Sequence, residues 1–144
     1  MSRSGAMDRI DALLSTVSDP AFVSVMRGEP LGIAATPVLA FWITSRDVNY
    51  MTLTDVTTNT EFLIRAFFRM QTSADVRESL ELDVWDAMVN IDQALRGDAD
   101  LAGNVTDSSV GAASTGYTEM SGVSYRTMDI PFIVEIDGEI TITP

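Results

Sequence analysis

Residues 73–96 read SADVRESLELDVWDAMVNIDQALR, and they carry the clearest structural pattern of the chain. Ser73 is a good N-cap, because its hydroxyl can accept a hydrogen bond from a backbone N–H that the first helical turn leaves unpaired. Gly97 lies just beyond the other end, where glycine commonly ends a helix. The stretch therefore predicts a long helix over residues 74–95. Its main apolar stripe, about 120° wide, is made of Val76, Leu80, Val84, Met88, Ile91 and Leu95.

The same helix carries a second apolar stripe, formed by Leu82, Trp85 and Val89 and centred about 150° from the first. A helix that packs on a sheet needs only one apolar face, so something else must cover this stripe. One interpretation is that an N-terminal helix of the same chain covers it. The other, which we favour, is a subunit interface, because tryptophan is enriched in interfaces and large exposed apolar patches are rare on monomers.

Strand patterns precede this helix. Residues 38–44 are apolar at nearly every position, which is typical of a strand covered on both faces. Residues 60–70 alternate, with Phe62, Ile64, Ala66, Phe68 and Met70 on one face and Glu61, Leu63, Arg65, Phe67 and Arg69 on the other. We expect the polar residues 45–58 to form the tip of a long hairpin. A first helix is expected over residues 7–17, ended by Pro20.

The C-terminal part predicts a moderate strand, then a strong strand with a short return strand after it. A loop and a moderate strand around Val105 and Val110 fall within residues 101–113, and a flexible loop follows at residues 114–117. The strongest strand covers residues 123–136, where Pro131 indicates an edge position or a bulge. Asp137-Gly138 is a hairpin-turn signal before a short return strand at residues 139–143. The order is helix, strand, strand, helix, strand, strand. This predicts an α+β fold in which residues 1–144 form one domain with a single, mostly antiparallel sheet.

Composition excludes several classes of protein. The 144 residues contain no Cys and no His, so disulfides, thiol nucleophiles, Cys/His zinc sites and Ser-His-Asp triads are absent. The net charge is −12, with nine Arg and no Lys, which disfavours electrostatic binding to nucleic acid or anionic membranes. No apolar run approaches the length of a membrane span, and the N-terminus lacks the apolar region of a signal peptide. We expect a protein made in a cytoplasm.

The residues give little support for an enzyme. Asp83 and Asp86 are neighbours on the long helix, and Asp98 and Asp100 share a loop, but such acids are commonly a solvated surface. No glycine motif for phosphate binding occurs, and no His or Lys is present to activate a serine. We therefore expect no catalytic residues, no metal and no cofactor.

The order of elements and several local phrases resemble the tail terminator, or tail completion, proteins of long-tailed bacteriophages. The resemblance rests on a strand after Thr36-Pro37 that continues as Val-Leu-Ala-Phe, and on the long helix that opens at Ser73. A late strand with Asp-Ile-Pro-Phe, residues 129–132, completes the pattern. The similarity covers nearly the whole chain.

This resemblance implies a structural virion protein that forms a ring, typically of six subunits, at the head-proximal end of the tail tube. Such a ring stops tube polymerisation and joins the tail to the neck. Its partners would be the tube protein and the neck or connector proteins, with genomic DNA passing through the lumen without specific binding. Assembly would take place in the host cytoplasm, with no membrane involved. Because residues 73–144 hold 14 acids and three Arg, an acidic lumen that repels DNA phosphates is a further hypothesis.

We assign two groups of contact residues on this interpretation. The subunit interface is predicted at Leu82, Trp85, Val89, Trp42, Leu63 and Phe67. Loops that meet the partner rings are predicted at Tyr50, Met51, Asp55, Tyr117 and Met120. Two alternatives stay open: another tail or neck ring component, such as a tube or head-completion protein, and a small-molecule-binding α+β domain or an enzyme that works only through carboxylates.

Overall fold

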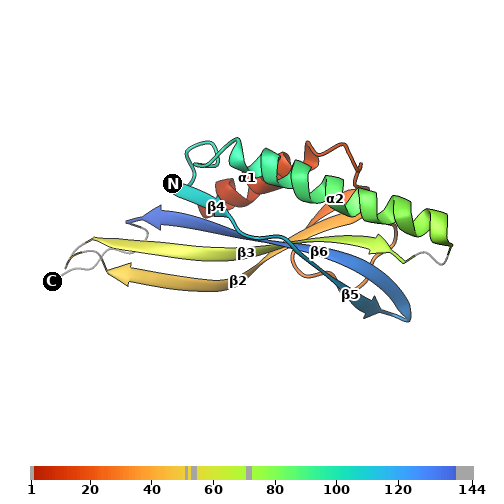
Figure 1. Cartoon of the computed structure of the whole chain (residues 1–144). Helices are drawn as coiled ribbons and strands as arrows, with labels where there is room; N and C mark the ends of the chain where they lie inside the picture. The colour runs from red at the N-terminus through yellow and green to blue at the C-terminus, as the bar shows by residue number, and fades with distance from the viewer. Residues whose placement is uncertain (1, 51, 53–54, 71–72, 139–144) are drawn as a thin grey trace.

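The computed structural model describes residues 2–50, 52, 55–70 and 73–138, and it places two helices on one face of a six-stranded sheet (Figure 1). This arrangement confirms the predicted α+β class. The elements in chain order are α1 (Arg3–Ser15), β1 (Ser24–Arg27), β2 (Val38–Tyr50), β3 (Val56–Arg69), α2 (Ala74–Arg96), β4 (Asp107–Val110), β5 (Ser114–Met120) and β6 (Val123–Asp137).

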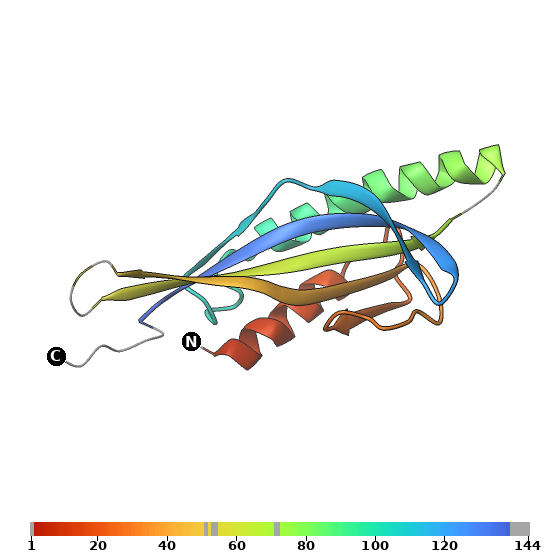
Figure 2. The ribbon, with the colours of Figure 1, turned by 90° about the horizontal axis from the view of Figure 1, so that it is seen from below.

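The sheet is mixed but mostly antiparallel. Its order is β1-β2-β3-β6, and both β4 and β5 pair with the outer side of β6. Only β1 runs parallel to its neighbour, β2. In Figure 2, α1 lies along the β2 side of the sheet, while α2 lies along the side of β6 and its outer strands. The two helices therefore occupy opposite lateral sides of the molecule.

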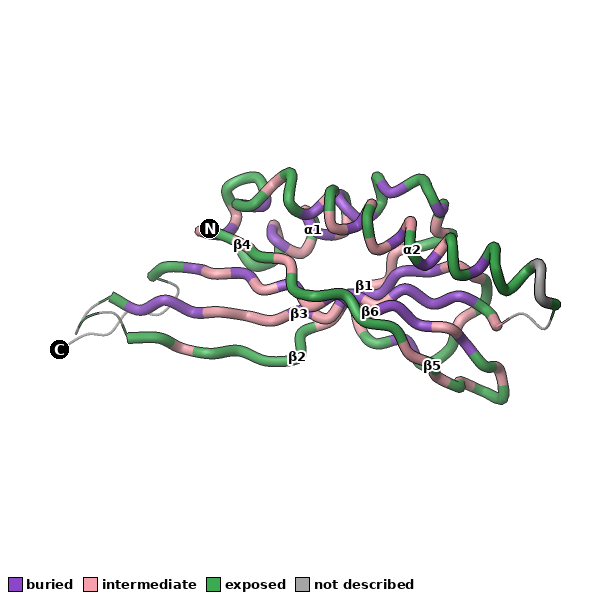
Figure 3. Tube along the Cα trace, viewed as in Figure 1, coloured by how far each residue is buried: buried purple, intermediate pink, exposed green. Residues whose placement is uncertain are grey.

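The hairpin of β2 and β3 is longer than the sequence predicts. Residues 45–58 were expected to form a tip, but pairing continues from Val38 with Phe67 as far as Tyr50 with Val56. Threonine has a high strand propensity, and β6 supplies partners for this region: the Thr57 hydroxyl donates to Asp137 Oδ1 at 2.8 Å. Beyond Ile43, β2 is mostly exposed (Figure 3).

Two further expectations need correction. Residues 114–117, expected as a flexible loop, begin β5, whose polar side chains are held by pairing with β6 rather than by a core of their own. Pro131 does not lie on an edge strand, but it lies where the outer strands carry one extra residue between the Val110–Phe132 and Ser114–Asp129 pairs, which agrees with the alternative expectation of a bulge. Its carbonyl accepts from the Gly111 N–H at 2.7 Å, at the break between β4 and β5, where no strand partner needs a proline N–H.

Both helices begin at serine caps. The Ser73 hydroxyl accepts from the Val76 N–H at 3.4 Å, as predicted, and α2 ends one residue later than expected. The Ser2 hydroxyl accepts from the Gly5 N–H at 3.0 Å, so α1 starts four residues earlier than its apolar pattern indicates. The expected return strand at residues 139–143 lies outside the described residues. In the described part of the chain, no helix is long and apolar enough to cross a membrane.

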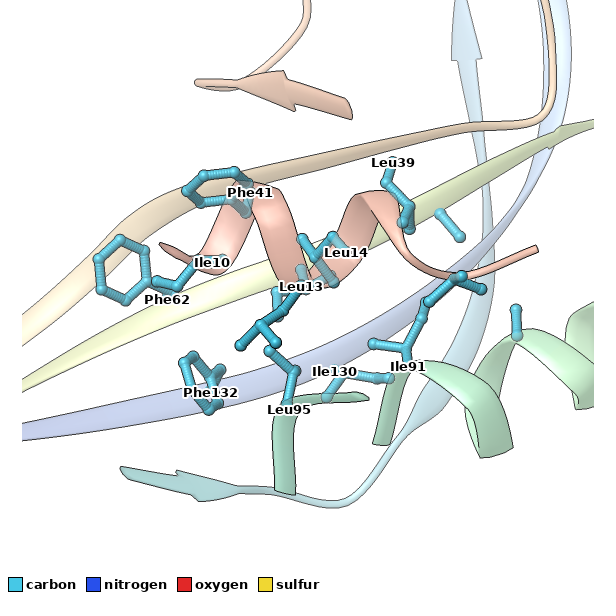
Figure 4. Close-up of a cluster of buried hydrophobic side chains, with 14 of the residues drawn as sticks. Ile10, Leu13, Leu14, Leu39, Phe41, Phe62, Ile91, Leu95, Ile130 and Phe132 are labelled. Atoms are coloured by element: carbon cyan, nitrogen blue, oxygen red, sulfur yellow. The ribbon is translucent and has the colours of Figure 1, made fainter. Parts of the chain in front are cut away.

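The main core lies between the helices and the sheet (Figure 4). It joins α1, α2 and the central strands through fully buried side chains, which include Ile10, Leu14, Phe41, Ile91, Leu95, Ile130 and Phe132. A smaller cluster on the opposite face contains Val38, Ala40, Phe67 and Tyr125. Residues 38–41 of β2 are thus buried on both faces, as their continuous apolar pattern predicts, but the expectation fails for the rest of residues 38–44, because Ile43 is 55% exposed.

Candidate interaction surface

The second apolar stripe of α2 is exposed. Leu82, Trp85 and Val89, which we call the α2 stripe, have 53%, 66% and 43% of their surface accessible. The main stripe of the same helix packs into the core, where Leu80, Val84, Ile91 and Leu95 are buried, except for Val76 in the first turn, which is 43% exposed. The interpretation that α1 covers the second stripe is therefore wrong, because α1 lies on the other lateral side of the sheet (Figure 2).

Two grooves run beside Trp85, between α2 and the outer strands. One is lined by Leu82, Trp85 and Met88 together with Thr115 and Arg126 of the sheet. The other is lined by Trp85 and Val89 and by the link between β4 and β5, residues 111–113. Met88 of α2, together with Val110 and Ile130 of the sheet, also lines this second groove.

An arginine of β6 ties this helix to the sheet. Arg126 donates to both carboxylate oxygens of Glu81, from Nε at 3.0 Å and from NH2 at 3.3 Å. Its guanidinium also lies 4.7 Å from the ring centroid of Tyr117 on β5. The part of α2 that carries the stripe is thus held by an ion pair as well as by apolar packing, and the cation–π contact holds the arginine on the sheet.

The helix-free face of the sheet holds the other predicted interface residues. Arg65 donates to both oxygens of Asp129, at 2.7 and 2.9 Å, and its guanidinium lies 5.5 Å from the Trp42 ring centroid. Trp42 and Leu63 are half-buried and face each other across β2 and β3. Phe67 is buried against Tyr125 within the subunit, so it offers almost no surface to a second chain.

The residues predicted to meet partner rings lie at the two ends of the sheet rather than at one site. Tyr50 and Asp55 flank the turn between β2 and β3, and both are exposed. Tyr117 and Met120 belong to the β5–β6 hairpin at the opposite end (Figure 1). Met51 lies outside the described residues.

A row of three acids and one asparagine crosses four strands on the helix-free face of the sheet. Asp47, Asn59, Glu135 and Asp107 are cross-strand neighbours on β2, β3, β6 and β4. Glu61 and Asp137 occupy the same face in the adjacent rows. Directly opposed residues share one face of a sheet, so these carboxylates form a single negative surface.

A pocket under α1 escaped the sequence analysis. It has a volume of about 160 Å³ and lies between the start of α1 and the outer halves of β2, β3 and β6. We call it the α1 pocket. It is lined by Arg3, Ala6, Met7, Ile43, Arg46, Thr60, Phe62, Val134 and Ile136. Ile43 is 55% exposed at this site although it belongs to the most apolar strand of the chain. The missed signal was the early start of α1, which brings Arg3 and Ala6 over the hairpin.

Two acids have shifted pKa values. Partial burial, with the charges of Asp86 and Asp19 in addition, raises the pKa of Asp83. The hydrogen bond from Arg9, at 2.6 Å, together with that from the Ala102 N–H, lowers the pKa of Asp98. The Asp98 contact fastens α1 to the loop after α2. Within the described residues, no group of three or more acids is placed to hold a metal ion.

The chain matches no protein-family model, and no curated protein matches it. The surfaces described above therefore carry the functional argument.

Proposed function

We propose that this chain is a structural subunit that assembles with copies of itself into a ring, and that the ring acts as a tail terminator of a long-tailed bacteriophage. The observation that carries the proposal is the α2 stripe. Three large apolar side chains in line on a rigid helix, with a tryptophan at the centre, are typical of an interface between subunits.

The placement of the other surfaces supports a ring that sits between two partners. The β2–β3 hairpin, which ends near the exposed Tyr50, and the β5–β6 hairpin, which carries the exposed Tyr117 along β5, extend to opposite ends of the sheet. Subunits joined through their lateral sides would direct one end toward the tail tube and the other toward the neck. The resemblance to tail terminators supplies the identity of these partners.

The acids of the helix-free face support a channel that DNA can pass. With Asp47, Glu135 and Asp107 in one row, this face repels phosphates, so DNA would move along it without being held. On this proposal the helix-free face of the sheet lines the channel, and the six acids of α2 do not.

Light scattering and negative-stain images of the purified protein test the proposal. A ring of six 15.6 kDa subunits has a mass of about 94 kDa and a central hole. Open-ended stacks would instead indicate a tube protein, because a tube subunit polymerises whereas a terminator stops at one ring. A 15.6 kDa species that is stabilised by a small molecule would contradict the proposal and favour a ligand-binding domain.

A further inference from the structure

Two surfaces of the chain complement each other in shape and in charge. The α2 stripe projects from the helix, with Trp85 as its most exposed member. The α1 pocket is a concave apolar site with a floor formed by the buried Phe62, Val134 and Ile136. The α2 stripe is therefore an apolar projection, and the α1 pocket is an apolar hollow.

The charges around the two surfaces are opposite. Helix α2 contains six acids and two Arg, and the exposed Glu78 stands one turn before Leu82, in line with the stripe. The charged residues that line the α1 pocket are Arg3 and Arg46. Two α2 helices placed face to face would bring acids together, whereas α2 against the α1 pocket brings carboxylates toward guanidinium groups.

The size of the pocket suits an aromatic ring. Its volume of about 160 Å³ is close to that of engineered apolar cavities that hold benzene, roughly 150 Å³. An arginine at the rim of such a site can also stack on an indole, an arrangement that the chain already uses between Arg65 and Trp42.

We propose that Trp85 of one copy inserts into the α1 pocket of the next copy, with Leu82 and Val89 packed over Ile43 at its mouth. This inference rests on the self-assembly proposed above and names the contact that produces it. The two surfaces are different parts of the subunit, one on α2 and the other between the start of α1 and the strands β2, β3 and β6, so the contact is heterologous and repeats from copy to copy. A contact of this kind makes a ring when its rotation closes.

A mixing experiment tests the pairing. Trp85→Glu blocks the projecting surface and Ile43→Glu blocks the pocket, and both positions are exposed, so each variant is expected to fold. Each variant alone is expected to remain at 15.6 kDa in light scattering. An equimolar mixture retains one intact pair of surfaces, because the Trp85→Glu copy keeps its pocket and the Ile43→Glu copy keeps its tryptophan. The mixture is expected to form a dimer of twice 15.6 kDa and no ring.

Leu31→Glu is the matched control, since Leu31 is 97% exposed and belongs to neither surface. This variant is expected to assemble as the wild type does. Circular dichroism of every variant establishes that it is folded before its mass is interpreted.

Three results separate this inference from the proposed function. If the wild type assembles and Ile43→Glu assembles equally well, the pocket is not the contact and the inference is overturned, while ring assembly stands. A mixture of folded variants that stays at 15.6 kDa also overturns the pairing. A wild type that never exceeds 15.6 kDa contradicts self-assembly, and the inference falls with it.

Discussion

Arg126 on β6 and Glu81 on α2 form an ion pair through two hydrogen bonds, at 3.0 and 3.3 Å, and this pair joins the exposed helix to the sheet. The Arg126 side chain is only 12% exposed, whereas that of Glu81 is 57% exposed. Because water reaches Glu81 more easily than Arg126, the charge of Arg126 relies more on its protein partners than the charge of Glu81 does.

Replacing Arg126 is expected to weaken the fold. Arg126→Met removes the ion pair and the contact with Tyr117 but retains a long apolar side chain, so we expect a loss of about 1–2 kcal/mol in the free energy of unfolding. Glu81→Gln, at the exposed end of the same pair, is expected to cost about 0.5 kcal/mol or less. Urea denaturation of both variants measures the difference, and equal losses would contradict the assignment of Arg126 as the buried anchor.

The stripe residue Trp85 is expected to matter for assembly and not for folding. Because its ring is mostly exposed in the subunit, Trp85→Ala is expected to change the free energy of unfolding by no more than about 0.5 kcal/mol. Loss of a central aromatic anchor commonly weakens an interface by about 2 kcal/mol, roughly 30-fold in affinity. Circular dichroism and sedimentation velocity separate the two effects. A variant that fails to fold would place Trp85 in the core.

The junction between β4 and β5 leaves little room for a side chain at Gly111. A Cβ on Gly111 would lie 3.0 Å from Pro131 Cγ and 3.2 Å from the Pro131 carbonyl oxygen. We expect Gly111→Val to lower the free energy of unfolding by about 1–3 kcal/mol, because the strand must move to admit the side chain. Gly32→Val is the control, since a Cβ there meets nothing within 4 Å. Thermal melts compare the two, and equal midpoints would contradict this close packing.

Asp83 and Asp98 are expected to affect the pH dependence of stability in opposite directions. The raised pKa of Asp83 in the folded state means that its ionised form opposes folding at neutral pH. Asp83→Asn is therefore expected to raise the melting temperature at pH 7, and the gain should shrink as the pH falls through the raised folded pKa toward the unfolded value of about 4.

The pKa of Asp98 is lowered, so its ionised form contributes stability above its unfolded pKa and loses it as the pH falls through the folded value. Asp98→Asn is expected to lower the melting temperature at pH 7 and to differ less from the wild type near pH 2. Melting curves from pH 2 to pH 7 measure both variants. If both variants changed the melting temperature in the same direction at pH 7, the environments assigned to Asp83 and Asp98 would be wrong.

The sequence predicts the elements whose apolar residues follow a period. The long helix and its Ser73 cap are confirmed, and so are the two faces of β3, because burial on one side imposes the alternation seen in Phe62, Ile64 and Ala66. Of the strands that sequence reasoning missed, β1 has only four residues and β5 is mostly polar. Residues 114–120 read STGYTEM and form β5 only because β6 offers a free edge. The pattern also left open what covers the second stripe, since the lateral position of α1 depends on the whole sheet.

The candidate interaction surfaces also include some residues that the sequence predicts and others that it does not. Leu82, Trp85 and Val89 follow from helical geometry alone. The α1 pocket does not, because Ile43, Arg46 and Phe62 line it only when α1 begins at Arg3 and crosses the hairpin. Phe67 was assigned to an interface from its face of the strand, and Tyr125, which covers it, comes from a distant part of the sequence.

The fluorescence of Trp85 is the most direct test of whether the α2 stripe forms the contact between subunits. In a Trp42→Phe background, Trp85 is the only tryptophan, and at low protein concentration its exposed indole should emit as a water-exposed residue does. As the protein concentration rises, the emission is expected to move to shorter wavelength. This shift should occur over the same range of concentration in which light scattering reports assembly. An emission that stays at the water-exposed position while the mass increases would show that the α2 stripe is not the contact between subunits.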